Sequence, residues 1–202
     1  MLEMAKTNPE PKCELYYRTP YQLLISVVMS AQATDKSVNK CMKPLYEQDL
    51  TPDQVLKMEE AGIFEKIKSI GLAKTKSKNI YALTKILIKE HNYRIPSDRQ
   101  ELQKLPGVGR KTANVVLAEI YNQPTLAVDT HVYRVSRRLG LHREDKPEKV
   151  EDILTQIIDE KFLPAAHHWF ILHGRYTCKA IKPNCQECII KDLCPSLELF
   201  MT

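Results

Sequence analysis

The sequence predicts an all-α protein, and three observations support this prediction. Apolar residues recur at the three- and four-residue spacing of helices along most of the 202-residue chain. Helix-start and helix-stop signals bound these runs, and convincing alternating strand patterns are absent. With 43% hydrophobic and 27% charged residues, the composition is that of a globular protein, with enough length for one medium domain or two small ones.

The helices expected in the first half of the chain rest on apolar stripes and capping signals. Residues 23–28 place two leucines and two valines on one stripe, and Thr51-Pro52 followed by Gln54 is a helix-start signal. Residues 74–90 carry isoleucines and leucines among lysines, which is the pattern of an amphipathic helix.

Further helices follow in the second half. Ser97 with Gln100 is interpreted as a capping box for a short helix that ends before Pro106. The remaining helices are expected over residues 110–121, over residues 129–139 with Gly140 as the C-cap, from Pro147 to about residue 160, and over residues 162–173.

Charge and composition restrict the class of protein. The formal net charge of +5 permits a polyanionic partner, although solvated lysines give the same count. The first twelve residues are polar, so we expect no signal peptide, and no run is long enough to span a bilayer. We therefore expect a cytosolic or organellar protein in a reducing compartment.

The stretch LPGVGRKTANVVL, residues 105–117, predicts a helix, a tight turn and a second helix. Gly107 and Gly109, on either side of Val108, permit positive φ and close approach by another backbone. The N–H groups that begin the second helix suit a phosphate oxygen, with Arg110 adding positive charge. The spacing does not match a P-loop. An ordinary helix connection remains nearly as good an interpretation of these letters.

Lys111 falls in the first turn of a helix that is apolar almost all round, so we expect this helix to be central and buried. Desolvation, the positive helix end and Arg110 would all disfavour the ammonium form. A lysine in such a place can act as a neutral amine nucleophile near pH 7. A solvated lysine at a helix end is the alternative.

The segment PTLAVDTHVYRVSRRLG contains a carboxylate before a helix. Asp129 is expected to be the N-cap, a role compatible with a functional one because the cap fixes its position. Arg134, Arg137 and Arg138 then share one helical face, which is either solvated or in contact with phosphates. His131 is expected to pack or cap more readily than to catalyse.

Four cysteines near the end of the chain have the spacing C-x6-C-x2-C-x5-C; they are Cys178, Cys185, Cys188 and Cys194. In a reducing compartment such a cluster favours a metal over disulfides. Only one C-x2-C knuckle exists, which favours a [4Fe–4S] cluster, and a four-cysteine zinc site is the chief alternative.

Taken together, the hairpin segment, the stretch LAVDTHVYRVSRRLGL, the cysteine spacing and the segment LLISVVMSAQATDKSVN resemble the endonuclease III family of helix-hairpin-helix DNA glycosylases over nearly the whole chain. The resemblance implies two helical lobes: residues 13–123 with the hairpin, and residues 1–12 with 124–202 around the cluster. The adenine-excising relatives lack the lysine and usually have an extra C-terminal domain. Because this chain has Lys111 and ends at Thr202, we expect that it is not one of these adenine-excising enzymes.

The resemblance also implies an activity: a bifunctional DNA N-glycosylase and AP lyase of base excision repair that removes oxidised pyrimidines from duplex DNA. By position, Lys111 is the nucleophile, Asp129 its partner, the four cysteines the ligands of a [4Fe–4S] cluster, and the DNA-binding residues are Gln32, Leu72, Gly107, Val108, Gly109, Arg110 and His131. We expect a monomer, not bound to membranes, in the bacterial cytoplasm and associated with the nucleoid through DNA. A non-catalytic DNA-binding module and an electron-transfer protein are the other hypotheses.

Overall fold

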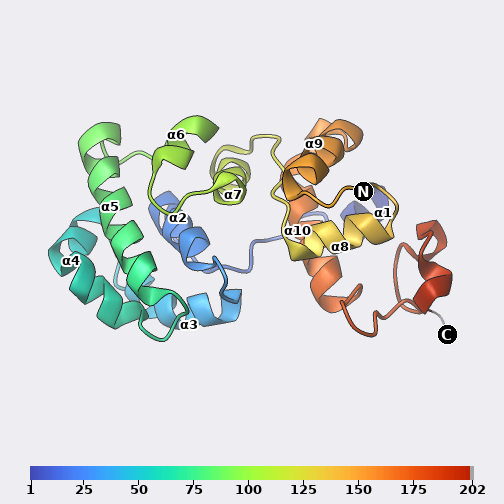
Figure 1. The fold of residues 1–202 in the computed structure, drawn as a ribbon, viewed down its shortest axis with the longest axis horizontal. Helices are drawn as coiled ribbons and strands as arrows, with labels where there is room; N and C mark the ends of the chain where they lie inside the picture. The colour runs from blue at the N-terminus through green and yellow to red at the C-terminus, as the bar shows by residue number, and fades with distance from the viewer. Residues whose placement is uncertain (201–202) are drawn as a thin grey trace. The chain divides into compact units, whose positions relative to one another are not determined.

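The computed structural model describes residues 1–200, and within this range the chain is helical without a single strand (Figure 1). The prediction of an all-α fold is therefore confirmed. The α-helices are α1 (Leu2–Thr7), α2 (Pro20–Met29), α3 (Asp35–Tyr46), α4 (Pro52–Ile67), α5 (Ala73–His91), α6 (Arg99–Lys104), α7 (Arg110–Tyr121), α8 (Thr130–Arg138), α9 (Pro147–Ile157) and α10 (Leu163–Tyr176). Short 3-10 helices are η1 (Glu160–Phe162), η2 (Lys191–Leu193) and η3 (Leu197–Phe200).

The chain divides into two compact units. Residues 13–121 form one, called here the hairpin unit, and residues 1–12 with 122–202 form the other, called here the cysteine unit. The lobes expected from the sequence, with a boundary after residue 123, remain a prediction about domain organisation.

In the hairpin unit, α2 is the most deeply buried helix. Every residue from Tyr21 to Met29 is buried, and the Oγ1 of Thr19 caps the helix by accepting from the N–H of Gln22. α2 packs against α3, α5 and α7, while α4 lies along α5 (Figure 1). Burying each leucine or isoleucine of this core contributes about 1.5–3 kcal/mol. The core thus holds α2, α5 and α7 in place, and these helices carry the loops described below.

The capping signals agree with the structure except at one helix. At α4 both hydrogen bonds of the predicted capping box form between Thr51 and Gln54. The box predicted at Ser97 is wrong, because α6 begins one residue later. Its N-cap is Asp98, whose carboxylate accepts from the N–H of Glu101 at 3.0 Å. The carboxylate and hydroxyl stand side by side in the sequence and both are good caps, so residue type alone did not separate them.

The cysteine unit has its own core, built mainly from α8, α9, α10 and the N-terminal segment. The indole N–H of Trp169 donates to the carbonyl of Asn8 at 2.7 Å, which fixes the N-terminal segment to α10. At the end of α8, Gly140 has φ 71° and the N–H of Leu141 donates to the carbonyl of Ser136. This is the Schellman motif that a glycine after a helix favours.

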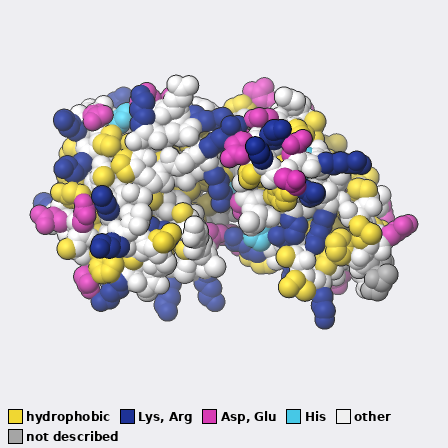
Figure 2. Space-filling view, viewed as in Figure 1, with side chains coloured by type: hydrophobic (Ala, Val, Ile, Leu, Met, Phe, Trp, Pro, Cys, Tyr) yellow, Lys and Arg dark blue, Asp and Glu magenta, His cyan; other side chains and the backbone are white. Residues whose placement is uncertain are grey.

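Two surface features bear on the kind of protein. Among the described residues, none of the helices has the length and hydropathy needed to cross a bilayer. Lys and Arg side chains are spread over the visible face of both units and mixed with Asp and Glu (Figure 2). The positive net charge alone therefore does not identify a binding surface, and the charge of each candidate site has to be considered separately.

Candidate functional site

The predicted hairpin joins α6 to α7, and its two glycines have different roles. Gly107 has φ 82°, and a Cβ there would lie 2.9 Å from Nδ2 of Asn79 and 3.2 Å from Cγ1 of Val28. Both the left-handed backbone and the close packing on α5 and α2 exclude a side chain. Gly107 is therefore structural, and it locks the turn against the core of the hairpin unit.

Gly109, by contrast, faces open space, since a Cβ there would meet no atom within 4 Å. Its carbonyl accepts the first helical hydrogen bond of α7, from the N–H of Ala113 at 2.9 Å. The positive end of the helix therefore starts beside an unobstructed backbone, which a phosphate group can approach closely. Lys104, on the other side of the hairpin, pairs with Glu101 at 2.6 Å, so part of its charge is offset.

Lys111 lies in the first turn of α7 and its side chain is exposed. The helix behind it is buried from Ala113 to Leu117, as its apolar sequence predicted.

Two further loop tips of the hairpin unit lie side by side. Gln32 follows α2 and has φ 53°, while Leu72 precedes α5 and has φ 62°. A Cβ on Gly71 would lie 3.9 Å from the carbonyl oxygen of Gln32. Leu72 is 54% exposed. A leucine in the left-handed region is uncommon, and it marks a strained loop tip.

Asp129, in the cysteine unit, is the N-cap of α8 as predicted. One carboxylate oxygen accepts from the N–H groups of His131 and Val132, both at 2.8 Å. His131 is half-buried and lies 3.1 Å from Nη2 of Arg134 through its Nδ1. Burial lowers the pKa of His131 below its usual value, and the charge of Asp129 opposes this shift.

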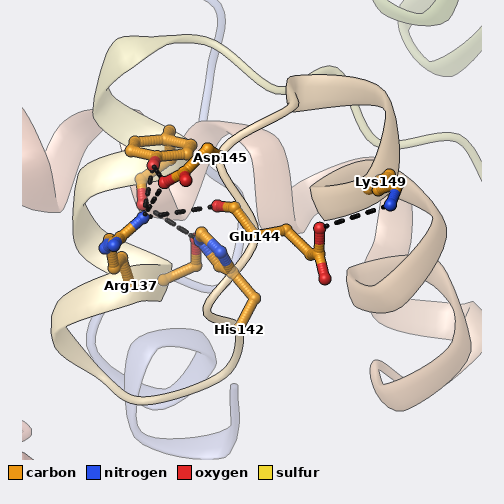
Figure 3. A network of polar contacts seen from close by, with 7 residues as sticks. Arg137, His142, Glu144, Asp145 and Lys149 are labelled. Atoms are coloured by element: carbon orange, nitrogen blue, oxygen red, sulfur yellow. Dashed lines mark hydrogen bonds and ion pairs between the residues drawn. The ribbon is translucent and has the colours of Figure 1, made fainter.

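The three arginines of α8 bind other parts of the same unit, and Arg137 remains exposed. Arg134 donates to the carbonyl of Gly174 at 2.8 Å, and Arg138 to that of Lys179 at 2.7 Å. Arg137 pairs with Asp145 at 2.7 Å and donates to the hydroxyl of Tyr133 (Figure 3). Helical periodicity predicted that these side chains share one face. It could not predict their partners, because most of these lie in other segments.

Figure 3 shows how this contact closes the connection from α8 to α9. Arg137 points toward Asp145, and Lys149 of α9 pairs with Glu144 at 3.7 Å. The hydrogen bond from Arg137 lowers the pKa of Asp145 below its usual value. These exposed pairs contribute little stability each.

The four cysteines predicted as metal ligands line one pocket of the cysteine unit, together with Arg138 and His173. Burial, and then the charges of Cys178 and Cys194, raise the pKa of the Cys185 thiol. Nη1 of Arg138 donates to Sγ of Cys178 at 3.3 Å. Four thiols around a shared space, beside a cation that offsets thiolate charge, fit a polynuclear cluster.

Sequence reasoning missed two supporting contacts. Asn79 of α5 packs against Gly107, and Arg138 reaches the cysteine pocket from α8. For Arg138, the sequence indicated only that it belongs to the basic stripe of its helix. For Asn79, the sequence contained no indication, because its contact with Gly107 joins segments about thirty residues apart.

A helical chain with a glycine hairpin at the start of a buried helix, and with a cysteine quartet, defines the class of helix-hairpin-helix proteins that carry an iron–sulfur site. Residues 25–160 match the HhH-GPD superfamily base excision DNA repair protein, and residues 178–194 match the iron-sulfur binding domain of endonuclease III. The chain belongs to the HhH-GPD superfamily, within it to the endonuclease III family, and it binds a [4Fe–4S] cluster.

Individual relatives agree with this assignment. Endonuclease III of Rickettsia felis is 56% identical over 94% of this chain and 89% of its own length. Endonuclease III of Escherichia coli K12 is 47% identical over 96% of this chain and 92% of its own.

A solved structure of a trapped endonuclease III–DNA covalent intermediate is 46% identical, with a TM-score of 0.91 over 99% of this chain and 94% of that one. A thermostable thymine-DNA glycosylase, 22% identical, shares the fold with a TM-score of 0.85 over 98% of this chain and 93% of its own.

Proposed function

We propose that this protein is a bifunctional DNA N-glycosylase and AP lyase of base excision repair that excises oxidised pyrimidines from duplex DNA. The observation that carries the proposal is an exposed lysine, Lys111, directly after the glycine hairpin in a member of the endonuclease III family. A relative 46% identical to this chain has been trapped as a covalent intermediate with DNA.

Lys111 is the proposed nucleophile. Its amine attacks C1′ of the damaged nucleotide, and the C1′–N bond breaks as the base leaves with a proton from the amine. The C1′–O4′ bond of the sugar then opens as O4′ takes up a proton, which leaves an iminium between the lysine nitrogen and C1′. This iminium makes a 2′ proton acidic. Loss of that proton and cleavage of the C3′–O bond break the strand 3′ of the abasic site. An amine nucleophile joins these steps, whereas water would stop at the abasic sugar.

Asp129 is the proposed partner of Lys111 in catalysis. The cap geometry fixes its carboxylate, because one oxygen accepts from two N–H groups of α8 at 2.8 Å. A fixed carboxylate can stabilise the positive charge that develops on the sugar as the base leaves, or it can accept a proton from the lysine.

Gln32 and Leu72 are proposed to occupy the space that the target base leaves. The base has to leave the stack for C1′ to be reached, which costs a few kcal/mol. The adjacent loop tips, both in the left-handed region, present an amide and an exposed apolar side chain for this purpose. The amide suits the opposite base, and the leucine suits the gap in the stack. His131 is proposed to contact the DNA from the cysteine unit.

The hairpin is the proposed phosphate site, with Gly107, Val108, Gly109 and Arg110 as its residues. Backbone amides at the start of α7 hold a phosphate without reading base sequence, which suits an enzyme that meets damage in any sequence context.

The two glycines allow a matched test of this site. Gly107→Ala is expected to lower the free energy of unfolding by about 2 kcal/mol, because it combines positive φ with the contact to Asn79. Gly109→Ala is expected to change that free energy by less than about 0.5 kcal/mol and to weaken duplex binding about tenfold. Urea unfolding and fluorescence anisotropy measure the two effects. Normal duplex binding by Gly109→Ala would exclude the phosphate role.

The four cysteines are the proposed ligands of the [4Fe–4S] cluster. When bound, the cluster crosslinks the segment from Cys178 to Cys194 and adds charge beside Arg138. The lysines of this segment then stand on a rigid loop.

The proposed partner is duplex DNA with damaged bases or abasic sites, bound by a monomer. The proposed location is the bacterial cytoplasm, where association with the nucleoid follows from DNA binding. Both proposals follow from the family and not from a contact in this structure.

Borohydride trapping with the wild-type protein tests the proposed function. Duplexes carrying thymine glycol, an abasic site or no lesion are incubated with protein and sodium borohydride and then separated by denaturing electrophoresis. We expect a covalent complex and strand cleavage with the first two duplexes and neither with the third. Binding to the damaged duplexes without trapping would instead identify a non-catalytic module.

A further inference from the structure

The hairpin unit has a large groove that the proposed reaction does not use. Its volume is about 740 Å³, and its lining includes Pro20, Pro52, Tyr93, Arg94, Ile95 and Tyr121. These residues come from the start of α2, the start of α4, the segment after α5 and the last turn of α7. The lining is mainly apolar and aromatic.

The groove lies at the opposite ends of the helices that carry the DNA-binding loops. α2 begins at the groove and ends before Gln32, α5 begins after Leu72 and ends before Tyr93, and α7 begins beside Lys111 and ends at Tyr121. At 1.5 Å per residue, these helices are about 15–28 Å long. A ligand in the groove therefore leaves the hairpin and the loop tips free for DNA.

Two tyrosine rings are held at the rim by their hydroxyl groups. The hydroxyl of Tyr93 donates to Asp53 at 3.1 Å, and that of Tyr121 donates to the carbonyl of Ile95. The two residues remain 47% and 37% exposed, respectively. Tyr93 and the preceding Asn92 both have positive φ. Rigid, exposed aromatic rings lose little entropy on binding, which is why tyrosines are common anchors in recognition sites.

The charges at the groove are mixed: Asp49 and Arg94 belong to its lining, and the carboxylate of Asp53 accepts from Tyr93 at its rim. Of the charged residues in its lining, Asp49 pairs with Arg18 at 2.6 Å, whereas Arg94 is exposed and makes no ion pair within residues 1–200. A second hollow of about 300 Å³ shares Leu50 with the groove and adds Lys57 to its lining. The two hollows form an elongated surface with two cations, which suits an extended acidic segment better than a compact small molecule.

We propose that this groove docks a short extended segment of a partner protein, with an apolar side chain against Tyr93 and Tyr121 and a carboxylate beside Arg94. The partner can bind while the opposite ends of the same helices engage DNA. The binding itself does not depend on the proposed catalytic activity.

A displayed library of random peptides, selected on the full-length cluster-loaded protein with counter-selection on Arg94→Glu, tests the proposal. We expect enriched peptides that combine an acidic residue with an aromatic or aliphatic neighbour. A synthetic copy should bind Arg94→Glu at least about tenfold more weakly in fluorescence anisotropy. Tyr93→Ala should weaken binding similarly.

The matched control is Lys89→Glu, the same charge reversal on α5 at an exposed residue outside the groove lining. It should bind the peptide within about twofold of wild type. Arg94→Glu should cleave abasic duplex at the wild-type rate, which shows that it is folded. The proposal is overturned if no peptide is enriched, if the peptides bind Arg94→Glu equally well, or if a lesion-free duplex displaces them. The last result would identify the groove as a nucleic-acid contact.

Discussion

Lys111→Ala is expected to abolish strand cleavage and borohydride trapping, with a loss of at least about 1,000-fold in the cleavage rate on thymine glycol duplex. Alanine has no amine, so the imine that makes the 2′ proton acidic cannot form. Single-turnover cleavage followed by denaturing electrophoresis measures the rate. Because the hairpin amides remain, binding to a duplex with an uncleavable abasic analogue should stay within about tenfold of wild type.

Lys104→Ala is the matched control for this experiment. Lys104 stands on the other side of the same hairpin, is exposed and pairs with Glu101. Its removal tests whether the loss of any positive charge near the hairpin has the same effect. We expect the cleavage rate to change by no more than about threefold. Full-speed cleavage by Lys111→Ala would show that another group supplies the nucleophile.

Asp129→Asn is expected to reduce cleavage by about 100-fold or more while leaving the fold intact. Asparagine is as good an N-cap as aspartate, and its side-chain oxygen can still accept from the N–H groups of His131 and Val132. The substitution thus removes the negative charge and keeps the cap. Thermal unfolding should change by no more than about 2 °C, so a loss of activity reports on the carboxylate.

Two variants complete this test. Asp98→Asn removes a carboxylate from the N-cap of α6 and should leave cleavage unchanged. Asp129→Ala should lose activity and also about 1 kcal/mol of stability, because the cap is lost as well. If Asp129→Asn cleaved as fast as wild type, the residue would be a cap alone.

Much of the fold was predictable from local signals. The α7 boundaries follow from a hairpin glycine before an apolar run, and the α8 boundaries follow from Asp129 at one end and Gly140 at the other. The capping box at Thr51 is equally local. Where two caps are adjacent, as at Ser97 and Asp98, the choice was not predictable, because it depends on how the chain enters the helix.

The candidate site was predictable as a set of residues. A glycine hairpin before a buried helix, an acidic N-cap and a cysteine quartet are patterns within short segments, and residue type determines their chemistry. The expectation that desolvation acts on Lys111 remains a prediction, and in the structure this residue is exposed at the start of α7. Periodicity shows which face of a helix is apolar, but not what covers the end of that helix.

By itself the sequence determined the helical class, most caps, the family and the residues offered for chemistry, because each depends on order and spacing along the chain. The tertiary structure alone decided that Gly107 is locked by Asn79 while Gly109 stays open, that the arginines of α8 bind other segments of their unit, and that Tyr93 and Tyr121 share a groove. Those outcomes depend on contacts between distant segments, which local pattern does not encode.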